Sequence, residues 1–300
     1  MRNLTVFAYG LADFIRDLAK KGTESDVTIY SRKDSEDITT FMVPSRFPEK
    51  ISSLTDCIYP SDYALVSGDT INRDLGEVIM ALDLAGVKRG TFIVKDSESE
   101  DRIRQIISRT GLRDYRFHTG SAMEFLDTLL QEKPVERFKT TTVVIDHFFK
   151  VKSVGTVALG FVLGGTVKKH QKLHCSFTDA EIQVRSIQVQ DVDMEEASTG
   201  SRVGLALKNI DTEEMERGMF LTEEPQKSVG EIRAEFQPYP SLKTKWNSGE
   251  IFIADQMRYQ RGFYESGELK LDRGMPLFRR ELIAVSPNST PRLQGLFRVA

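Results

Sequence analysis

The sequence predicts an α/β domain followed by two β-barrels, and a change of pattern along its 300 residues indicates this fold class. Up to about residue 133, short apolar runs alternate with segments whose apolar residues recur at helical spacing. From about residue 139, short β-rich runs broken by glycine replace them, and no long helical pattern remains. We therefore expect an α/β domain at residues 1–133, one barrel at 139–224 and a second at 226–300.

The alternation in the first domain is typical of a mostly parallel sheet covered by helices. Asp74 and Glu77 have capping-box spacing at the start of one helix, and Ser121 and Glu124 have it at the start of another. Gly22 is expected to end the first helix. We expect strands at residues 4–9, 27–31, 39–43, 63–66, 91–94 and 115–118, and helices at 11–18, 75–82, 103–107 and 121–130.

The second part of the chain is expected to contain only strands and turns. Residues 143–162, 182–189 and 203–207 have strand-like patterns, and so do shorter runs after residue 226. The glycine-rich run at 160–167 resembles a phosphate-binding loop in composition. No helix follows it, however, so it is predicted to be a hairpin turn.

Composition excludes several classes of protein. The net charge of −3 argues against a generally basic nucleic-acid binder, although residues 226–300 hold 12 Lys and Arg against 8 Asp and Glu. This local excess could contact RNA phosphates, with Arg279 and Arg280 as candidates, and an ordinary solvated surface fits it equally well. No apolar run approaches the roughly 20 residues of a membrane span. With only Cys57 and Cys175, a cytoplasmic protein with free thiols is expected.

The most specific pattern lies in residues 145–173 and 186–222. It consists of an acidic residue, an aromatic, a Gly-Thr-Val turn, a further glycine, a Val-Gly-Leu strand and a closing Glu-Arg-Gly. The residues that carry it are Asp146, Phe149, Gly155, Thr156, Val157, Gly160, Val203, Gly204, Leu205, Glu216, Arg217 and Gly218. This pattern resembles domain 2 of translational GTPases of the elongation factor Tu type. Its residues are most similar to those of selenocysteine-specific elongation factors (SelB) of archaeal type.

The resemblance implies that residues 1–133 are built like a P-loop GTPase domain, and Lys20 to Thr23 match the SelB-like subgroup there. The phosphate-binding motif itself is missing. A P-loop needs the pattern GxxxxGKS or GxxxxGKT, in which backbone amides and the lysine hold the phosphates and the hydroxyl holds Mg²⁺. After the first strand this chain offers only Gly10, and Asp13 and Asp17 would oppose a phosphate.

The other nucleotide motifs of the family are also degenerate here. Val43 to Arg46 stand in place of DxxG, and Phe47 stands where elongation factor Tu has its catalytic histidine. Lys95 and Asp96 stand within the former NKxD motif. Ser121 and Ala122 match the last guanine-side motif, but a plain helix cap explains them as well. We therefore expect a pseudo-GTPase with no nucleotide, metal or other cofactor and no catalytic residue.

Five residues of the first barrel are candidates for binding the aminoacyl end of a tRNA, because the resemblance places them at the family's pocket for that end. They are Asp146, His147, Gln190, Asp191 and Arg202. The chain departs from elongation factor Tu at His147, Asp191 and Arg202. Solvated residues at the edge of a barrel are the alternative interpretation.

The leading functional hypothesis is a non-catalytic, translation-factor-like protein that binds tRNA, ribosome or another translation component. An active GTPase with a divergent site is one alternative, and a protein-interaction scaffold unrelated to RNA is another. His170 and His174 have a zinc-like spacing but lack further ligands, so they are expected to be surface residues. Neither DNA nor a membrane is expected as a partner.

Overall fold

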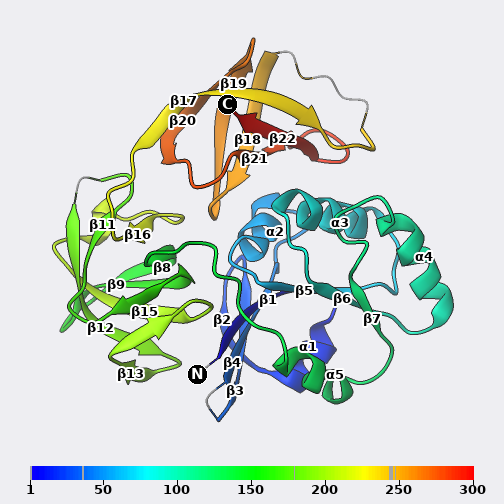
Figure 1. Ribbon diagram of the computed structural model, residues 1–300, viewed down its shortest axis with the longest axis horizontal. Coiled ribbons are helices and arrows are strands. Elements are labelled where there is room, and N and C mark those ends of the chain that lie inside the picture. Colours follow the sequence, from blue (N-terminus) through cyan, green and yellow to red (C-terminus); the bar gives the residue numbers. More distant parts are fainter. Residues whose placement is uncertain (1, 36, 179, 243–245, 247) are drawn as a thin grey trace. The chain divides into compact units, whose positions relative to one another are not determined.

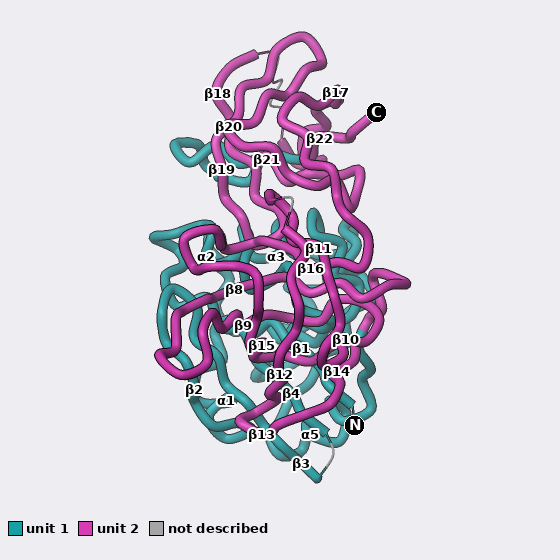
Figure 2. Tube along the Cα trace, turned by 90° about the vertical axis from the view of Figure 1, so that its left-hand side faces the viewer, with its two compact units in different colours: residues 1–134, 285–295 teal, residues 135–284, 296–300 magenta. Residues whose placement is uncertain are grey.

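The computed structural model describes residues 2–35, 37–178, 180–242, 246 and 248–300. The chain forms two compact units (Figure 2). The first contains residues 1–134 and 285–295, and the second contains residues 135–284 and 296–300. Among the described residues, no helix is long and apolar enough to cross a membrane.

The first unit contains a seven-stranded sheet in the order β2-β3-β4-β1-β5-β6-β7. Parallel pairing links β4, β1, β5, β6 and β7, whereas β2 and β3 pair in antiparallel fashion at one edge. The predicted, mostly parallel sheet is thus confirmed. The strands are β1 (Asn3–Tyr9), β2 (Lys20–Glu24), β3 (Thr28–Asp34), β4 (Asp37–Val43), β5 (Tyr63–Ser67), β6 (Gly90–Ile93) and β7 (Arg116–His118).

Helices cover both faces of this sheet (Figure 1). Helices α1 (Ala12–Leu18) and α5 (Ala122–Leu130) share one face, where Ile15 and Phe125 pack against Leu4 and Leu65. The remaining helices, α2 (Ile51–Ile58), α3 (Arg73–Ala85) and α4 (Ser97–Ile107), lie on the opposite side. Alternate residues of β1 point to the two faces, as the period of two in a strand requires.

Two elements of the first unit differ from the prediction. Helix α2 was not expected, although Ile51, Leu54 and Ile58 recur at helical spacing, because it has only eight residues and no side chain caps its start. Strand β2 contains Gly22, which was expected to end the first helix. That helix ends earlier, at Leu18, and the chain continues as an exposed edge strand paired with β3.

The helix starts test the two predicted capping boxes. At α5 the box is confirmed, because Ser121 and Glu124 bond to each other's backbone amides. At α3 the prediction was wrong. Asn72 is the cap, and its Oδ1 accepts a hydrogen bond from the Leu75 amide at 2.9 Å. Asp74 lies one residue inside the helix, where its negative charge suits the helix N-terminus.

The first barrel of the second unit is a ring of six strands. Strand order is β11-β16-β8-β9-β15-β12, and pairing of β11 with β12 closes the ring. Gly160 allows a close approach, because a Cβ there would lie 2.3 Å from the carbonyl oxygen of Val144. The strands are β8 (Thr142–Val151), β9 (Gly155–Gly164), β11 (Lys172–Cys175), β12 (Glu181–Val189), β15 (Arg202–Lys208) and β16 (Phe220–Thr222), with β10 (Thr166–Lys168), β13 (Val192–Met194) and β14 (Glu196–Ser198) beside them.

The glycine-rich run at 160–167 lies in this barrel, but the predicted hairpin turn was wrong, because residues 160–164 continue β9 and β10 pairs with β14 rather than with β9. It forms the end of β9, a turn at Gly165 with φ of +62°, and the start of β10. Cys175 is buried, and burial raises the pKa of its thiol to about 12. His170 lies in the turn after β10 with φ of +67°. No cluster of metal-ligating side chains is found within the described parts of the chain.

The last strands form a second closed barrel in the order β17-β20-β19-β18-β21-β22. Its core includes Ile232, Ile253, Leu269 and Phe297. The two expected barrels are thus confirmed. The strands are β17 (Ser228–Pro238), β18 (Ser248–Asp255), β19 (Arg258–Glu265), β20 (Glu268–Pro276), β21 (Glu281–Val285) and β22 (Leu293–Val299). The sequence segment 243–245 and residue 247 lie outside the described residues.

Charged and close-packed residues join the two barrels within the second unit. Glu216, from the first barrel, forms ion pairs with Arg258 and Arg273 of the second. Gly218 has φ of +78°, and a Cβ there would lie 2.4 Å from the carbonyl oxygen of Gln256. The closing Glu-Arg-Gly of the sequence pattern therefore has a packing role at this junction.

Candidate functional site

Three of the five predicted barrel residues meet at one place. A bulge in the pairing of β8 with β9 occurs between Ile145 and His147, so Asp146 is the extra residue. Its Oδ2 accepts a hydrogen bond from Arg202 Nη2 at 3.1 Å and lies 3.0 Å from His147 Nδ1. We call these three residues the Asp146 group.

The Asp146 group is a buried charge pair with a half-exposed imidazole. The side chains of Asp146 and Arg202 are 2% and 14% exposed, and that of His147 is 33% exposed. Burial alone would raise the pKa of Asp146, but the Arg202 guanidinium and the His147 hydrogen bond outweigh it and hold that pKa below its usual value. Asp146 is therefore an anion at neutral pH.

Some polar atoms around this group have no hydrogen-bond partner in the described structure. They are Asp146 Oδ1, Arg202 Nε and the hydroxyl of the neighbouring Ser201. Buried polar atoms normally have partners, so such a set can receive a polar ligand or water. The Arg202 guanidinium also lies 5.8 Å from the centre of the Phe161 ring. The arrangement offers a planar cation, an anion and an aromatic face.

Gln190 and Asp191 occupy the hairpin turn between β12 and β13. Both have positive φ, of +49° and +60°. Because Gln188 pairs with Gly204 at the start of β15, this turn lies at the same end of the sheet as Arg202. Within the described residues, Asp191 has no hydrogen bond or ion pair to Asp146 or Arg202. Its residue type suits the left-handed turn, so a structural role explains it.

The edge of the first sheet where a GTPase holds nucleotide is built differently here. Only Gly10 and Leu11 separate the end of β1 from the start of α1. A P-loop motif spans about eight residues, so two residues cannot wrap a phosphate. Gly10 has φ of +71°, and a Cβ there would lie 2.9 Å from that of Ser67. The space beside the turn is thus occupied by the chain itself.

The other degenerate positions have structural roles. Asp96 caps α4 by accepting from the Ser99 amide at 2.8 Å, and the Lys95 amide donates to Asp69 at 2.9 Å. Val43 ends β4, and Ala122 begins α5 after the Ser121 cap. The Arg46 amide donates to the hydroxyl of Ser53.

Phe47, at the position of the family's catalytic histidine, is a packing residue. It is 7% exposed and lies edge-on to Tyr9 with a centroid distance of 5.7 Å. The Arg292 guanidinium lies 5.5 Å from its centroid. Burial, together with the charge of Asp74, raises the pKa of Tyr9, so that hydroxyl stays neutral.

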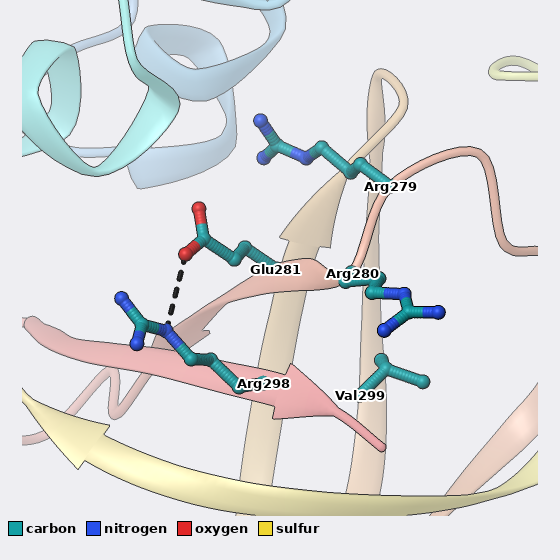
Figure 3. A pocket seen from close by; sticks show the side chains of 5 residues that line it. All are labelled: Arg279, Arg280, Glu281, Arg298 and Val299. Atoms are coloured by element: carbon teal, nitrogen blue, oxygen red, sulfur yellow. Dashed lines mark hydrogen bonds and ion pairs between the residues drawn. The ribbon is translucent and has the colours of Figure 1, made fainter.

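Arg279 and Arg280 differ in their surroundings (Figure 3). Arg279 pairs at 2.8 Å with Asp255, whose side chain is fully buried. Arg280 is exposed, and Arg298 pairs with Glu281 at 3.1 Å. These residues line a shallow hollow of the second barrel, and in Figure 3 the Arg280 side chain points to the side opposite those of Arg279 and Arg298. Arg280 therefore remains a phosphate-contact candidate, whereas Arg279 compensates a buried carboxylate.

One buried ion pair was missed by reasoning from the sequence. Glu77 on α3 is 2% exposed, and both its oxygens bond to the Arg292 guanidinium. The Arg292 amide donates to the same carboxylate at 2.6 Å. A signal was present, since Glu77 shares a helix face with Met80, Ala81 and Leu84, which follow it by three, four and seven residues and are all buried.

Comparison with known proteins agrees with this architecture. The family model for elongation factor Tu domain 2 matches residues 155–222. The solved structure of translation elongation factor SelB from Methanococcus maripaludis superposes with a TM-score of 0.84, at 18% identity, over 100% of this chain and 79% of that one. The selenocysteine-specific elongation factor of Methanocaldococcus jannaschii is 31% identical over 170 residues, covering 53% of this chain and 35% of that one. The chain belongs to the SelB-like translational GTPase family.

Two further relatives differ in how much of their length this SelB-like chain covers. An uncharacterized protein of M. jannaschii is 37% identical over 256 residues, which is 84% of this chain and 82% of that protein. Elongation factor 1-alpha of Cenarchaeum symbiosum is 31% identical over 255 residues, 76% of this chain and 54% of that factor. The SelB-like chain thus spans about a third to a half of the two named elongation factors it matches. These similarities support a translation-factor-like role.

Proposed function

We propose that this chain is a non-catalytic member of its family that binds a translation component through its first barrel and needs no guanine nucleotide. The ligand is the acceptor end of a tRNA or a ribosomal RNA segment in the cytoplasm. The observation that carries the proposal is a contrast between two places. The turn after β1 is too short to hold a phosphate, whereas the Asp146 group is assembled on its barrel.

The chemistry of the Asp146 group suits an RNA end that carries an amino acid. Arg202 can donate to phosphate or ester oxygens through its planar fork. Asp146 has one oxygen without a partner, which can accept from an ammonium or a hydroxyl group. His147 is the most exposed of the three and can donate or accept, depending on its protonation.

Substitution of Arg202 tests this proposal. Arg202→Ala would also leave the buried Asp146 carboxylate unpaired, so Arg202→Lys is the sharper variant because it keeps a cation there. We expect Arg202→Lys to weaken binding of aminoacyl-tRNA by about 1–3 kcal/mol, measured by fluorescence anisotropy. The reason is the loss of the guanidinium fork.

Arg185→Ala supplies the matched control. Arg185 lies exposed on β12 of the same barrel, and its guanidinium donates to the carbonyl oxygen of Val154 at 3.1 Å. Its loss should change binding by less than twofold. Because Arg202→Lys keeps a cation, equal losses in the two variants would argue against a specific role for the guanidinium fork of Arg202. If the wild-type chain binds neither tRNA nor ribosomes, the protein-scaffold alternative replaces the proposal.

A further inference from the structure

A hollow of about 530 Å³ lies at the end of the first sheet opposite the nucleotide edge. It is formed by the connection from α3 to β6 and the connection from α4 to β7. Its lining consists of Lys88, Arg109, Thr110, Gly111, Arg113 and Asp114. Three of these side chains are cationic and none is apolar. We call this feature the α4–β7 hollow.

The frame of the α4–β7 hollow is held by bonds that do not involve its cations. The hydroxyl of Tyr115, which is 3% exposed, donates to the carbonyl oxygen of Val87 at 2.7 Å. The Gly111 amide donates to Asp83 Oδ1 at 2.8 Å, so the second connection is tied to α3. The hydroxyl of Thr110 accepts from the Leu112 amide at 3.1 Å. The three cations therefore project from a fixed backbone.

Most of the positive charge at this hollow is not neutralised. Arg113 lies 3.6 Å from Asp114, but both side chains are at least 70% exposed, so the pair contributes little. Lys88 and Arg109 are exposed and form no ion pair within the described residues. Three cations thus lie beside two carboxylates, Asp114 in the lining and Asp83 behind Gly111, in a chain whose net charge is −3.

We propose that the α4–β7 hollow binds phosphate groups of an RNA backbone, at a site separate from both the nucleotide edge and the Asp146 group. Guanidinium forks and an ammonium are the side chains that recognise phosphate. Protein partners usually dock on a patch with an apolar core, and this lining has none. The RNA assignment rests on the proposed function, whereas phosphate recognition rests only on the charges of the hollow.

A triple variant tests the assignment without touching the frame. In Lys88→Gln/Arg109→Gln/Arg113→Gln, the bonds of Tyr115, Gly111 and Thr110 remain, so the fold should be retained. The control Arg16→Gln/Lys20→Gln/Lys33→Gln removes the same number of exposed charges elsewhere in the first unit. Both are titrated with a fluorescent single-stranded RNA and with tRNA across a range of salt concentrations.

We expect the triple variant to bind at least tenfold more weakly at low salt. The slope of log Kd against log salt should fall by about two, because each lost phosphate contact removes about 0.7 of a counterion. The control should match the wild type. Unchanged affinity and slope in the triple variant would overturn the RNA assignment.

Two further probes identify the source of the phosphate. Calorimetric titration with inorganic phosphate asks whether a small anion binds the hollow, independently of any RNA. Loss of that binding in the triple variant, with RNA binding unchanged, would overturn the RNA assignment and leave a small phosphate-bearing ligand. Polyglutamate is the second probe, and loss of its binding in the triple variant, with RNA binding unchanged, would overturn the RNA assignment in favour of an acidic protein. If the wild type binds no RNA but the triple variant loses phosphate binding, the proposed function fails and the phosphate site stands.

Discussion

At the residue scale, Asp146 shows what a sequence can and cannot reveal. Its place in the family pattern marks it as a candidate on the strength of the sequence alone. Its pairing with Arg202 spans 56 residues and depends on a bulge that turns one side chain inward. A bulge of one residue leaves no periodic signal, so the pair could not be predicted.

The buried pair makes a prediction about pH. The folded-state pKa of Asp146 is lowered, so its contribution to stability is present above the unfolded pKa and is lost as pH falls through the folded value. Asp146→Asn should therefore cost about 3 kcal/mol at pH 7, because Arg202 is left without its partner. The cost should shrink as pH falls from about 5, since an unfolded aspartate becomes protonated near pH 4.

Urea unfolding of the wild type and of Asp146→Asn at several pH values checks this. The difference in unfolding free energy should narrow steadily from about pH 5 to the most acidic pH at which the wild type folds. A difference that stays constant over that range would mean that Asp146 is not the anion described here.

At the scale of elements, local signals were reliable where the partners are close in sequence. Ser121 and Glu124 form the predicted capping box, because both bonds lie within one turn of helix. The same spacing at Asp74 and Glu77 gave a wrong prediction. Asn72 offers an equivalent oxygen earlier in the chain, and Glu77 is bound by Arg292, which is 215 residues away.

Gly218 gives a prediction about how the two barrels join. A methyl group there would meet both the Gln256 carbonyl oxygen and Arg258 Cγ, at 2.4 and 2.3 Å. Gly155→Ala is the matched control, because Gly155 also has positive φ but a methyl group there would meet nothing within 4 Å. In both variants the left-handed backbone should lower the free energy of unfolding by roughly 1–2 kcal/mol. Gly218→Ala should cost about 1–3 kcal/mol more through overcrowding.

Thermal and urea unfolding of the two glycine variants distinguish the cost of the left-handed backbone from the cost of overcrowding. Equal destabilisation would show that the backbone conformation alone matters at Gly218. In that case the closing Glu-Arg-Gly pattern would have no packing role between the barrels.

At the scale of the whole molecule, the order of an α/β part followed by two barrels was predictable, because periodicity changes with fold class. The prediction missed α2, which is short and has no cap, and β2, an exposed polar edge strand. Both elements depend on packing or pairing with distant residues. The loss of the P-loop was visible in the sequence. In the structure, only two residues lie between the end of β1 and the start of α1.

The central claim is that this protein works without a nucleotide. Binding of aminoacyl-tRNA to the wild-type chain, measured in one titration series with GTP and Mg²⁺, with GDP and Mg²⁺, and with neither, tests it most directly. We expect salt-dependent binding with the same Kd in all three conditions, since two residues between β1 and α1 cannot hold a phosphate. Binding that appears only with GTP and disappears when EDTA removes Mg²⁺ would contradict it.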